Sequence, residues 1–451
     1  MKKNYLIITT LFLQFLASAQ CWSEATSGYA HTIARKSDGT LWAWGSNGSG
    51  ELGLNNFTNT STPSQIAADN DWSYISANKD QTLAIRTDGT LWGWGLNTYG
   101  QAGSILQTMI GLPTQIGTAN DWQTVNAGAF FGLGVKTNGT LWGWGSNGNG
   151  IFGNGTFNSS FVPIQCGSAT DWQKVSGGDH QMLAIKTNGT LWSCGWNQYG
   201  EVGDGTGVIR TTHVQIGTST WLEASAGYSH SVAIKSDGTL WAWGWNSNGQ
   251  LGDGTLTNRN APVQIGNASD WAAVSAGQAH TLALKSDGTL WGWGLNNSGQ
   301  IANSASVQTT PFQIGTADDW VSIDASGTHS VAINSDGTLF TWGYNSHGQL
   351  GTGNTASTAN PYNVGCPPSL STNGLASEAK ISLYPNPAQD KVVIFSASET
   401  TFEIMDVVGK SIQKGKLNAG HNPFDISSLE SGTYFVRIPG IAVRTLKLMK
   451  Q

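Results

Sequence analysis

Short runs of apolar and β-branched residues alternate with polar, glycine-rich stretches along most of this 451-residue chain, and the alternation recurs in a fixed period. Its clearest marker is a phrase close to Asp/Asn-Gly-Thr-Leu-Trp-x-Trp, which occurs seven times. The glycine of this phrase falls at positions 39, 89, 139, 189, 238, 288 and 337, so successive copies are 49 or 50 residues apart. A period of this size is typical of one supersecondary unit copied in a row, as in solenoids, propellers and arrays.

One unit, taken from Asp270 to Gly315, contains four short runs with the composition of β-strands. The middle two runs flank an Asp-Gly pair, which predicts a hairpin with a tight two-residue turn at positive φ angles. In the run Leu290–Trp293 the side-chain alternation of a strand puts both indoles on one face. Four strands in about 50 residues make one propeller blade, whose edges radial stacking protects. The predicted fold class is therefore all-β, with a seven-bladed β-propeller over residues 20–366.

The two ends of the repeat array decide between a closed ring and a linear stack. A linear array needs polar caps, and neither end of this array has one in its sequence. The last copy ends at Gly365 and the first begins at Trp22, so Cys366 and Cys21 occupy the places that residues i and i+3 have in an internal joint. A turn brings such positions within about 7 Å, close to disulfide reach. We therefore predict a ring locked by a Cys21–Cys366 disulfide; two unrelated terminal cysteines are the alternative.

The segments outside the repeats differ from them in composition. Residues 1–19 combine two lysines, an apolar run and a small-x-small cleavage site, which predicts a secretory signal peptide. Acylation of Cys21 is a weaker alternative, because the residue before it is not small. No other apolar run reaches the roughly 18 residues needed to span a bilayer. Residues 367–380 form a polar linker, and residues 381–451 alternate like strands between turn signals, which predicts a small C-terminal β-sandwich.

Charge and cysteine content narrow the partners and the compartment. Residues 20–366 contain 11 basic and 21 acidic residues, a net charge of −10, whereas a duplex-binding surface needs clustered cations. We therefore expect no binding to nucleic acid. Four cysteines in an exported chain permit disulfides. Cys166 and Cys194 replace apolar residues of the repeat, so pairing with each other and burial as small hydrophobes both remain open.

Two parts of the chain resemble known families. The run His230–Gly244, with Asn246, the Gly-Gln-Leu-Gly loop and Pro262 after it, resembles the repeat of the regulator of chromosome condensation family. This resemblance covers about residues 21–366 in the same internal order and implies a seven-bladed propeller. Trp at positions where eukaryotic members more often have Tyr favours a bacterial branch.

A second set of residues lies in the C-terminal part of the chain, at Tyr384, Pro385, Asn386, Pro387, Gly432, Tyr434 and Lys447. With these residues the segment resembles the type A C-terminal sorting domain of the type IX secretion system of Bacteroidetes. The resemblance implies that this domain engages the secretion machinery and takes its cargo across the outer membrane. We therefore expect a protein that is released outside the cell or attached to its surface.

Several repeated positions carry residue types that occur in metal sites or catalytic sites, but the pattern of the repeat favours a structural role for them. A second tryptophan recurs near the start of every copy, at Trp22, Trp72, Trp122, Trp172, Trp221, Trp271 and Trp320. The ninth residue after it is, in the seven copies, His31, Gln81, Phe131, Gln181, His230, His280 and His329. Because Gln and Phe are accepted there, structural hydrogen bonding is favoured over a metal ring. The Asp and Asn residues of the hairpins fit turn geometry, and two Gly-Asp-Gly-Thr segments lack the spaced ligands of a calcium loop. We expect no catalytic residue, no metal and no cofactor.

Function must then come from what differs among the copies. The most variable stretch follows the Gly-Gln-Leu-Gly loop, and it supplies eight candidate partner-binding residues: Phe57, Ile105, Leu106, Met109, Phe157, Phe161, Ile209 and Arg210. Equivalent loops should line one face, and exposed apolar side chains on a rigid scaffold mark partner surfaces. Capping of their own blades is the alternative.

Taken together, these features predict a non-catalytic binding module for an extracellular protein or glycan. The family resemblance allows a different class of function, the regulation of another enzyme. Such regulation would be nucleotide exchange on a small GTPase or inhibition of a secreted hydrolase such as a β-lactamase.

Overall fold

The structure is a computed structural model that describes residues 21–104, 107–367, 382–384, 388–396, 399–406, 410–418, 420–438 and 444–450. Its contacts divide the chain into two compact units, Met1–Pro368 and Ser369–Gln451. The predicted signal peptide and nearly all of the predicted linker lie outside the described residues.

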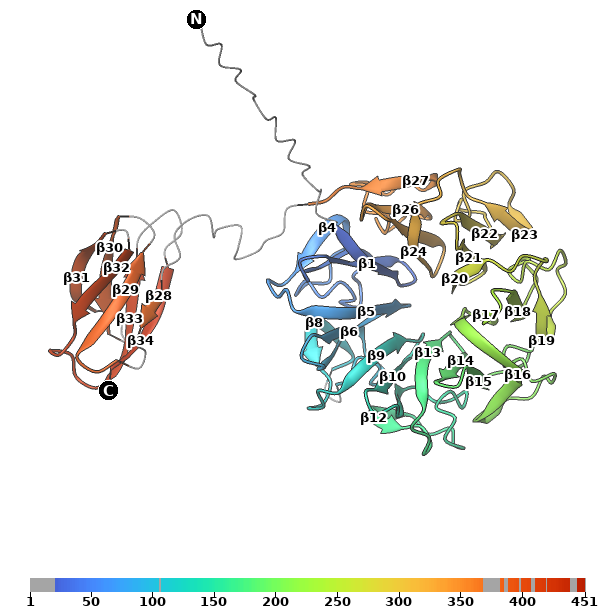
Figure 1. Cartoon of the computed structure of the whole chain (residues 1–451), viewed down its shortest axis with the longest axis horizontal. Coiled ribbons are helices and arrows are strands. Elements are labelled where there is room, and N and C mark those ends of the chain that lie inside the picture. The colour runs from blue at the N-terminus through green and yellow to red at the C-terminus, as the bar shows by residue number, and fades with distance from the viewer. Residues whose placement is uncertain are drawn as a thin grey trace, which may run out of the picture. The chain divides into compact units, whose positions relative to one another are not determined.

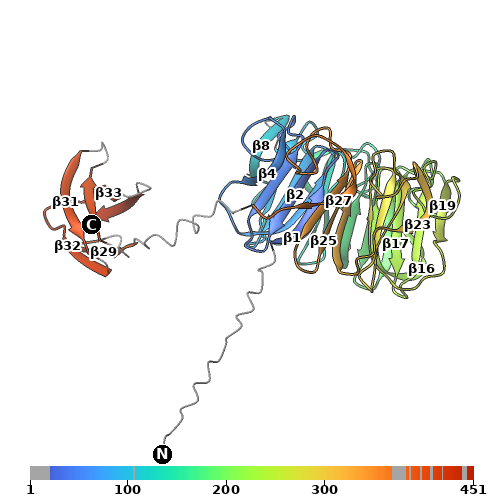
Figure 2. The same cartoon turned by 90° about the horizontal axis from the view of Figure 1, so that it is seen from above.

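The first unit is a ring of seven four-stranded antiparallel blades around a central axis (Figure 1), so the predicted fold class is confirmed. Seen from the side, the ring is a disc formed by a single layer of blades (Figure 2). We number the blades 1 to 7 in chain order. The strands of blades 1 and 2 are β1 (Trp22–Ser27), β2 (His31–Lys36), β3 (Leu41–Gly45), β4 (Thr60–Ile66), β5 (Trp72–Asn78), β6 (Gln81–Arg86), β7 (Leu91–Leu96) and β8 (Met109–Gln115).

The middle blades follow the same order. The strands of blades 3 and 4 are β9 (Trp122–Ala127), β10 (Phe131–Lys136), β11 (Leu141–Gly145), β12 (Ser160–Gln165), β13 (Trp172–Gly177), β14 (Gln181–Lys186), β15 (Thr190–Gly195) and β16 (Arg210–Ala226). Strand β16 continues without a break from the outer edge of blade 4 to the inner position of blade 5, and so joins both sheets.

The last blades complete the ring. Their strands are β17 (His230–Lys235), β18 (Leu240–Gly244), β19 (Arg259–Gln264), β20 (Trp271–Ala276), β21 (His280–Lys285), β22 (Leu290–Leu295), β23 (Val307–Gln313), β24 (Trp320–Ala325), β25 (His329–Asn334), β26 (Leu339–Gly343) and β27 (Thr358–Val364). The first strand of each blade contacts the first strands of its neighbours, so these strands surround the axis.

The hairpin between the second and third strands differs from the prediction in one detail. In blade 1 the backbone N of Lys36 donates to the carbonyl O of Thr40 at 3.0 Å, so the loop has three residues rather than two. Only Gly39 has a positive φ, of 82°. Asp38 accepts bonds from the backbone N of Thr40 at 3.0 Å and from its hydroxyl at 2.6 Å. The Asp or Asn is therefore selected as the side chain that caps the turn, and Gly alone takes the left-handed conformation.

Tryptophan packing between adjacent blades forms the core. In blade 6 the ring of Trp271 contacts Trp291 and Trp293 edge-on at 5.9 and 6.2 Å, so both hairpin indoles share one face as predicted. Trp293 is fully buried, and its Nε1 donates to the carbonyl of Gln250 in blade 5 at 2.9 Å. Five blades, those of Trp44, Trp144, Trp243, Trp293 and Trp342, thus insert an indole and one directed hydrogen bond into the blade before them. Trp94 of blade 2 is equally buried but makes no such bond.

Blade 4 departs from this rule at the position of the second indole, where Cys194 takes its place. Cys194 and Cys166 are both free and buried, in one apolar cluster with Phe152 and Met182. The two thiols are therefore small hydrophobic core residues in the structure and do not form a disulfide. Burial raises the pKa of the Cys166 thiol to about 12, so it is inert near neutral pH.

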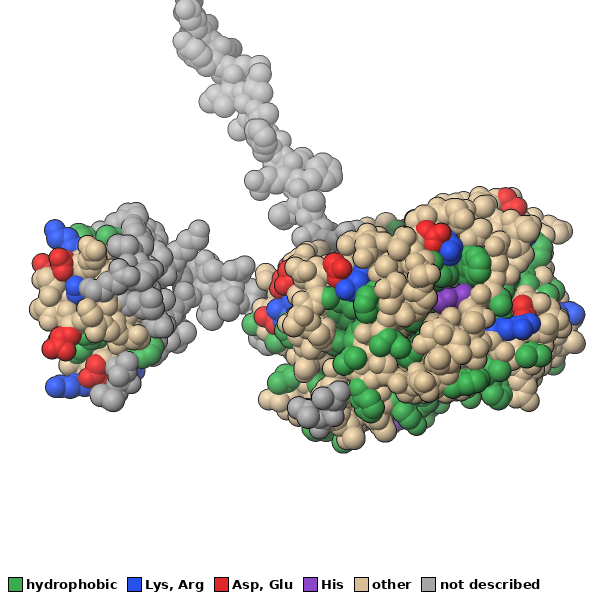
Figure 3. Space-filling model, turned by 90° about the horizontal axis from the view of Figure 1, so that it is seen from below, with side chains coloured by type: hydrophobic (Ala, Val, Ile, Leu, Met, Phe, Trp, Pro, Cys, Tyr) green, Lys and Arg blue, Asp and Glu red, His purple; other side chains and the backbone are tan. Residues whose placement is uncertain are grey.

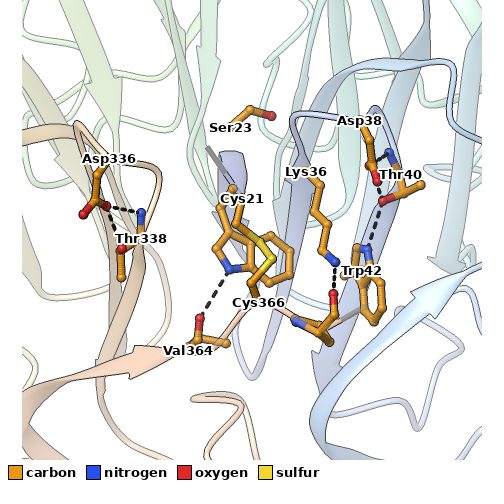
Figure 4. The surroundings of a disulfide bond; sticks show 12 residues. Cys21, Ser23, Lys36, Asp38, Thr40, Trp42, Asp336, Thr338, Val364 and Cys366 are labelled. Atoms are coloured by element: carbon orange, nitrogen blue, oxygen red, sulfur yellow. Dashed lines mark hydrogen bonds between the residues drawn. A yellow bond between two sulfur atoms is a disulfide. The ribbon is translucent and has the colours of Figure 1, made fainter. Parts of the chain in front are cut away.

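The ring closes without exchange of a strand, since blades 1 and 7 are each built from their own four strands. Cys21 and Cys366 are joined by a disulfide across this joint, with their Cα atoms 6.0 Å apart (Figure 4). Beside it, Nε1 of Trp22 donates to the carbonyl of Val364 at 3.3 Å, and the Lys36 ammonium donates to the carbonyl of Pro367. The covalent bond thus lies at the joint where the first and last blades of the propeller meet.

The second unit is a small β-sandwich of two antiparallel sheets. One sheet has the order β28-β29-β32 and the other β31-β30-β33-β34, with one apolar cluster that includes Val392, Ile394, Phe402 and Val436. The strands are β28 (Ser382–Tyr384), β29 (Lys391–Ser396), β30 (Thr400–Met405), β31 (Ser411–Leu417), β32 (Gly420–Asp425), β33 (Gly432–Ile438) and β34 (Arg444–Lys450).

Candidate binding site

The antiparallel order of each blade separates its connections onto two faces of the disc. The loops from the first to the second strand and from the third to the fourth strand open on one face, which we call the loop face. The hairpin turns and the joints between blades lie on the other, which we call the turn face.

On the turn face, Lys and Arg side chains have a structural role. In blade 6, Nζ of Lys285 lies 5.3 Å from the ring centroid of Trp271 and 5.0 Å from that of Trp291, and it pairs with Asp270 at 3.2 Å. Five other blades place Lys or Arg between the same two indoles, at Lys36, Arg86, Lys136, Lys186 and Lys235. These tryptophans are therefore stacked on cations and on each other, which leaves them unsuited to a sugar ring.

The repeated histidines link neighbouring blades. Nε2 of His230 in blade 5 lies 3.1 Å from the hydroxyl of Thr281 in blade 6, and both side chains are fully buried. At the equivalent position Gln81 donates to the carbonyl of Phe131 in the next blade at 2.7 Å. Burial lowers the pKa of His230 to about 3, so the ring is neutral and does not exchange protons near neutral pH. These contacts agree with the structural role predicted for the position.

Among the described residues, no group of three or more His, Cys, Asp and Glu side chains is placed to hold a metal ion. The described part of the chain also contains no helix that is long and apolar enough to cross a membrane.

Six of the eight predicted partner-binding residues are among the described residues, and they lie at the rim of the loop face, in or near the loops that lead to the fourth strands. Phe57, Met109, Phe157 and Phe161 are 53%, 43%, 52% and 47% exposed. Phe161 also lies over Gly100 of the preceding blade, where a Cβ would come within 2.6 Å of its ring. The ring of Phe57 likewise lies beside Gly111 of blade 2, where a Cβ would come within 3.5 Å of it. The structure thus shows apolar exposure in three successive blades, with two of the four side chains also packing against a neighbouring blade.

The other four candidates contribute less to this surface. Ile209 is half-buried, and Arg210 pairs with Asp204 at 2.5 Å within its own blade, which fits the capping alternative. Ile105 and Leu106 lie outside the described residues. Sequence reasoning missed three further side chains at the rim that are more than half exposed, namely Val162, Val208 and Leu256.

A channel runs along the axis, and one ring of side chains in it joins every blade to the next. Each of these side chains accepts a hydrogen bond from a backbone N of the following blade; they are Thr26, Ser76, Asn126, Ser176, Ser225, Ser275 and Asp324. Asp324 closes the ring by accepting from both the backbone N and the hydroxyl of Ser27 at 2.6 Å. Burial raises the pKa of Asp324 to about 6. Sequence reasoning did not find this ring, although its signal is a small polar residue at the same place in every copy.

The channel opens on the loop face through a mouth formed by the loops from the first to the second strand. A cavity of about 90 Å³ there is lined by side chains that include Tyr29, Lys79, Asp179, Tyr228 and Gln278. These residues occupy equivalent places in five copies, and they share neither size nor charge. The mouth is thus the second part of the propeller, after the rim, where the copies diverge.

Charged side chains are sparse over the propeller surface. Figure 3 shows one side of it, where a few basic and acidic side chains, often side by side, lie among uncharged ones and apolar side chains form scattered groups. Arg35 pairs with Glu24, Lys174 with Glu223 and Arg259 with Asp253, which uses further cations internally. Electrostatic attraction over a broad surface therefore contributes little to the binding of a partner.

Comparison with protein families and solved structures follows the same division into two units. A model of the RCC1-like domain matches residues 13–273, and models of the regulator of chromosome condensation (RCC1) repeat match residues 271–300, 320–349, 287–333 and 336–374. A model of the secretion system C-terminal sorting domain matches residues 382–449.

Two of the similar solved structures are propellers from human and yeast. Human WBSCR16 is 21% identical with a TM-score of 0.67, over 73% of this chain and 94% of that one. Yeast RCC1 (Prp20), solved bound to Kap60, is 17% identical with a TM-score of 0.65, over 84% of this chain and 91% of that one. At these identities the likeness concerns the fold.

The sorting-motif residues are distributed over the C-terminal sandwich. Tyr384 is on β28, Gly432 and Tyr434 are on β33, and Lys447 is on β34. The hydroxyl of Tyr434 donates to the carbonyl of Glu430 at 2.9 Å, which fastens the turn before its strand. Pro385, Asn386 and Pro387 lie outside the described residues.

Proposed function

The chain belongs to the family of RCC1-like domains, and we propose that it uses its propeller as a non-catalytic binding module for an extracellular protein or glycan. Its C-terminal sorting domain engages the type IX secretion machinery and directs export across the outer membrane, to the cell surface or the extracellular space. The proposal includes a cleaved signal peptide over residues 1–19 and a sorting unit that begins near residue 381.

The exposed apolar rim supports this proposal most directly. Phe57, Met109 and Phe157 come from blades 1, 2 and 3, and each is more than two fifths exposed on a scaffold whose blades are locked together. Phe57 and Phe157 occupy the same place in their repeats, and Met109 lies two residues further along in blade 2. Apolar side chains exposed in the same region of adjacent repeats favour contact with a partner. The buried histidines and cysteines are occupied by packing and hydrogen bonds, which also favours binding over catalysis.

The test is a capture experiment with the full chain, using culture medium for proteins and an array of glycans for carbohydrates. The triple variant Phe57→Ser, Met109→Ser and Phe157→Ser should lose at least tenfold in binding to a captured protein, with an unchanged melting temperature. Leu256→Ser is the matched control, because it is 56% exposed on the rim of blade 5 and lies outside the patch. Absence of any ligand in both formats would contradict the binding function.

Regulation of another enzyme is the competing function. The yeast relative is described by its binding to Gsp1p and histones, and these are partners inside a cell, unlike those of an exported chain. Capture of one enzyme in a stoichiometric amount, with loss of that enzyme's activity, would assign the regulatory function in place of a general binding role.

A further inference from the structure

The loop that carries Lys79 differs in backbone from its counterparts. Asn78 replaces the glycine that five other copies have here and pairs with Gln81, so Lys79 and Asp80 form the loop between them. Lys79 is held at a φ of 46°, a left-handed conformation that is strained for a non-glycine residue. Such strain is retained where it positions a side chain. Here it directs the ammonium to 3.7 Å from the ring centroid of Phe130, in the next blade.

The mouth holds charges of both signs close together. The positive charge of Lys79 acts on Asp179 and on His180, and it works against the burial that raises the pKa of Asp179 to about 6. One ammonium and one carboxyl group therefore both line the cavity at the channel opening. The two opposite charges offset each other, so they give a strongly charged ligand little net attraction, and the propeller as a whole is acidic.

Aromatic side chains extend from this opening across blades 4 and 5. His180 contacts Tyr228 edge-on at 5.1 Å, Tyr228 contacts Trp245 at 6.4 Å, and Trp245 contacts Tyr199 at 6.3 Å. The amide of Asn149 lies 3.2 Å from Nδ1 of His180 and fixes that ring. Tyr199 at the far end is 39% exposed. The result is a row of aromatic faces with hydrogen-bonding groups at one end.

We propose that this row binds an uncharged polysaccharide, with sugar rings stacked along Tyr228 and Trp245 and a hydroxyl-bearing group between Lys79 and Asp179. A pyranose has an apolar face of C–H groups and a rim of hydroxyls, and the row offers aromatic faces beside one donor and one acceptor. The cavity of about 90 Å³ is smaller than the roughly 300 Å³ of a site that encloses a whole ligand. It therefore takes one end or one substituent of a chain that otherwise lies on the surface.

This inference rests on the proposed binding function but uses residues other than the apolar rim. A flat protein surface fits the rim better, because the rim side chains are more exposed and spread over three blades. The aromatic row is half-buried and narrow, which suits an extended chain of sugars.

The first test is affinity electrophoresis of the full chain in gels that contain a soluble β-glucan, α-glucan, mannan or xylan, with polygalacturonate as the charged counterpart. At least one neutral polysaccharide should retard the protein, and Trp245→Ala should weaken that retardation at least tenfold. Tyr344→Ala is the matched control, because Tyr344 has the same repeat position in blade 7 and is 39% exposed. It should change binding less than twofold.

A second variant separates binding from folding. Lys79→Gly relieves the left-handed strain, so its melting temperature should equal or exceed that of the unaltered chain, while retardation weakens at least fivefold. Retardation by no neutral polysaccharide, by polygalacturonate alone, or to the same extent in all variants would overturn the polysaccharide site. Capture of a protein through the rim, together with any of these results, would leave the binding function standing and remove only this inference.

Discussion

At the scale of single residues, most side chains at repeated positions have a structural role. The copies that carry a different residue at such a position are informative. The histidine position accepts Gln81 because an amide reaches the next blade's carbonyl as well as an imidazole reaches a hydroxyl. Asp324 is the exception in the axial ring, where the other six acceptors are hydroxyls or an amide. Its carboxyl group lies in the channel at the joint where blade 7 meets blade 1.

The pH dependence of stability should therefore include a contribution from Asp324. Its pKa is about 6 in the folded chain against an ordinary 3.8, so the folded state binds the proton more tightly. The stabilisation is complete below pH 3.8 and is lost as pH rises through about 6. Asp324→Asn keeps an acceptor, as Asn126 does, and should be more stable than the unaltered chain at pH 7 by about 1 kcal/mol, after allowing for water in the channel.

Denaturant titrations at pH 4 and pH 7 measure this effect. Asp179 and Glu201 also have raised pKa values, of about 6 and about 7, so only the difference between the variant and the unaltered chain reports on Asp324. Equal stability differences at the two pH values would contradict the assignment.

At the scale of the blade, the two indoles of one hairpin have different environments on the same face. Trp293 is fully buried against blade 5, whereas Trp291 is partly exposed and covers Lys285. The third strand thus places one aromatic side chain, Trp293, in the core and the other, Trp291, near the turn face. Sequence alternation shows that the two share a face, but not which one is more deeply buried.

Alanine substitution should separate these two roles. Trp293→Ala removes a buried ring and leaves a cavity, so it should lower the free energy of unfolding by about 3–5 kcal/mol. Trp291→Ala removes a cation–π contact and partial burial, which should cost about 1–2 kcal/mol. Urea midpoints of the two variants give the comparison, and equal losses would contradict the packing order.

At the scale of the whole molecule, ring closure depends on the joint between blades 7 and 1. No strand is shared across it, so apolar packing around Trp22, Val331 and Leu339, the Asp324–Ser27 bonds and the disulfide hold the ends together. A bond between residues 345 positions apart removes much of the freedom of the unfolded chain.

Loss of that bond should open the ring first at this joint. Cys21→Ser with Cys366→Ser should lower stability by about 3–5 kcal/mol and speed amide hydrogen exchange in β1 and β25 more than in β13 and β14. A reducing agent should reproduce the effect in the unaltered chain and change nothing further in the variant. An unchanged melting temperature would show that packing alone closes the ring.

Much of the architecture follows from local and periodic information in the chain. Seven copies of one strand pattern predict seven blades, and alternation along Leu290–Trp293 predicts a shared indole face, because both depend only on neighbours in sequence. Counting residues across one joint was enough to place Cys21 opposite Cys366. Spacing alone could not predict the three-residue turn at Asp38, because turn length depends on backbone angles. Nor could it predict that Phe161 packs on the adjacent blade, because that contact depends on how the blades are arranged.

The amino-acid sequence by itself determined the repeat, its copy number, the closing cysteines and the export domain, because each is written in contiguous residues or in a constant spacing. Only the tertiary structure decided which divergent positions meet. Lys79, Phe130, Asp179 and Tyr228 come from four blades and become one mouth because the ring places their loops around a common axis. The same holds for the ring closed by Asp324: radial symmetry turns equivalent positions that are about 50 residues apart into neighbours.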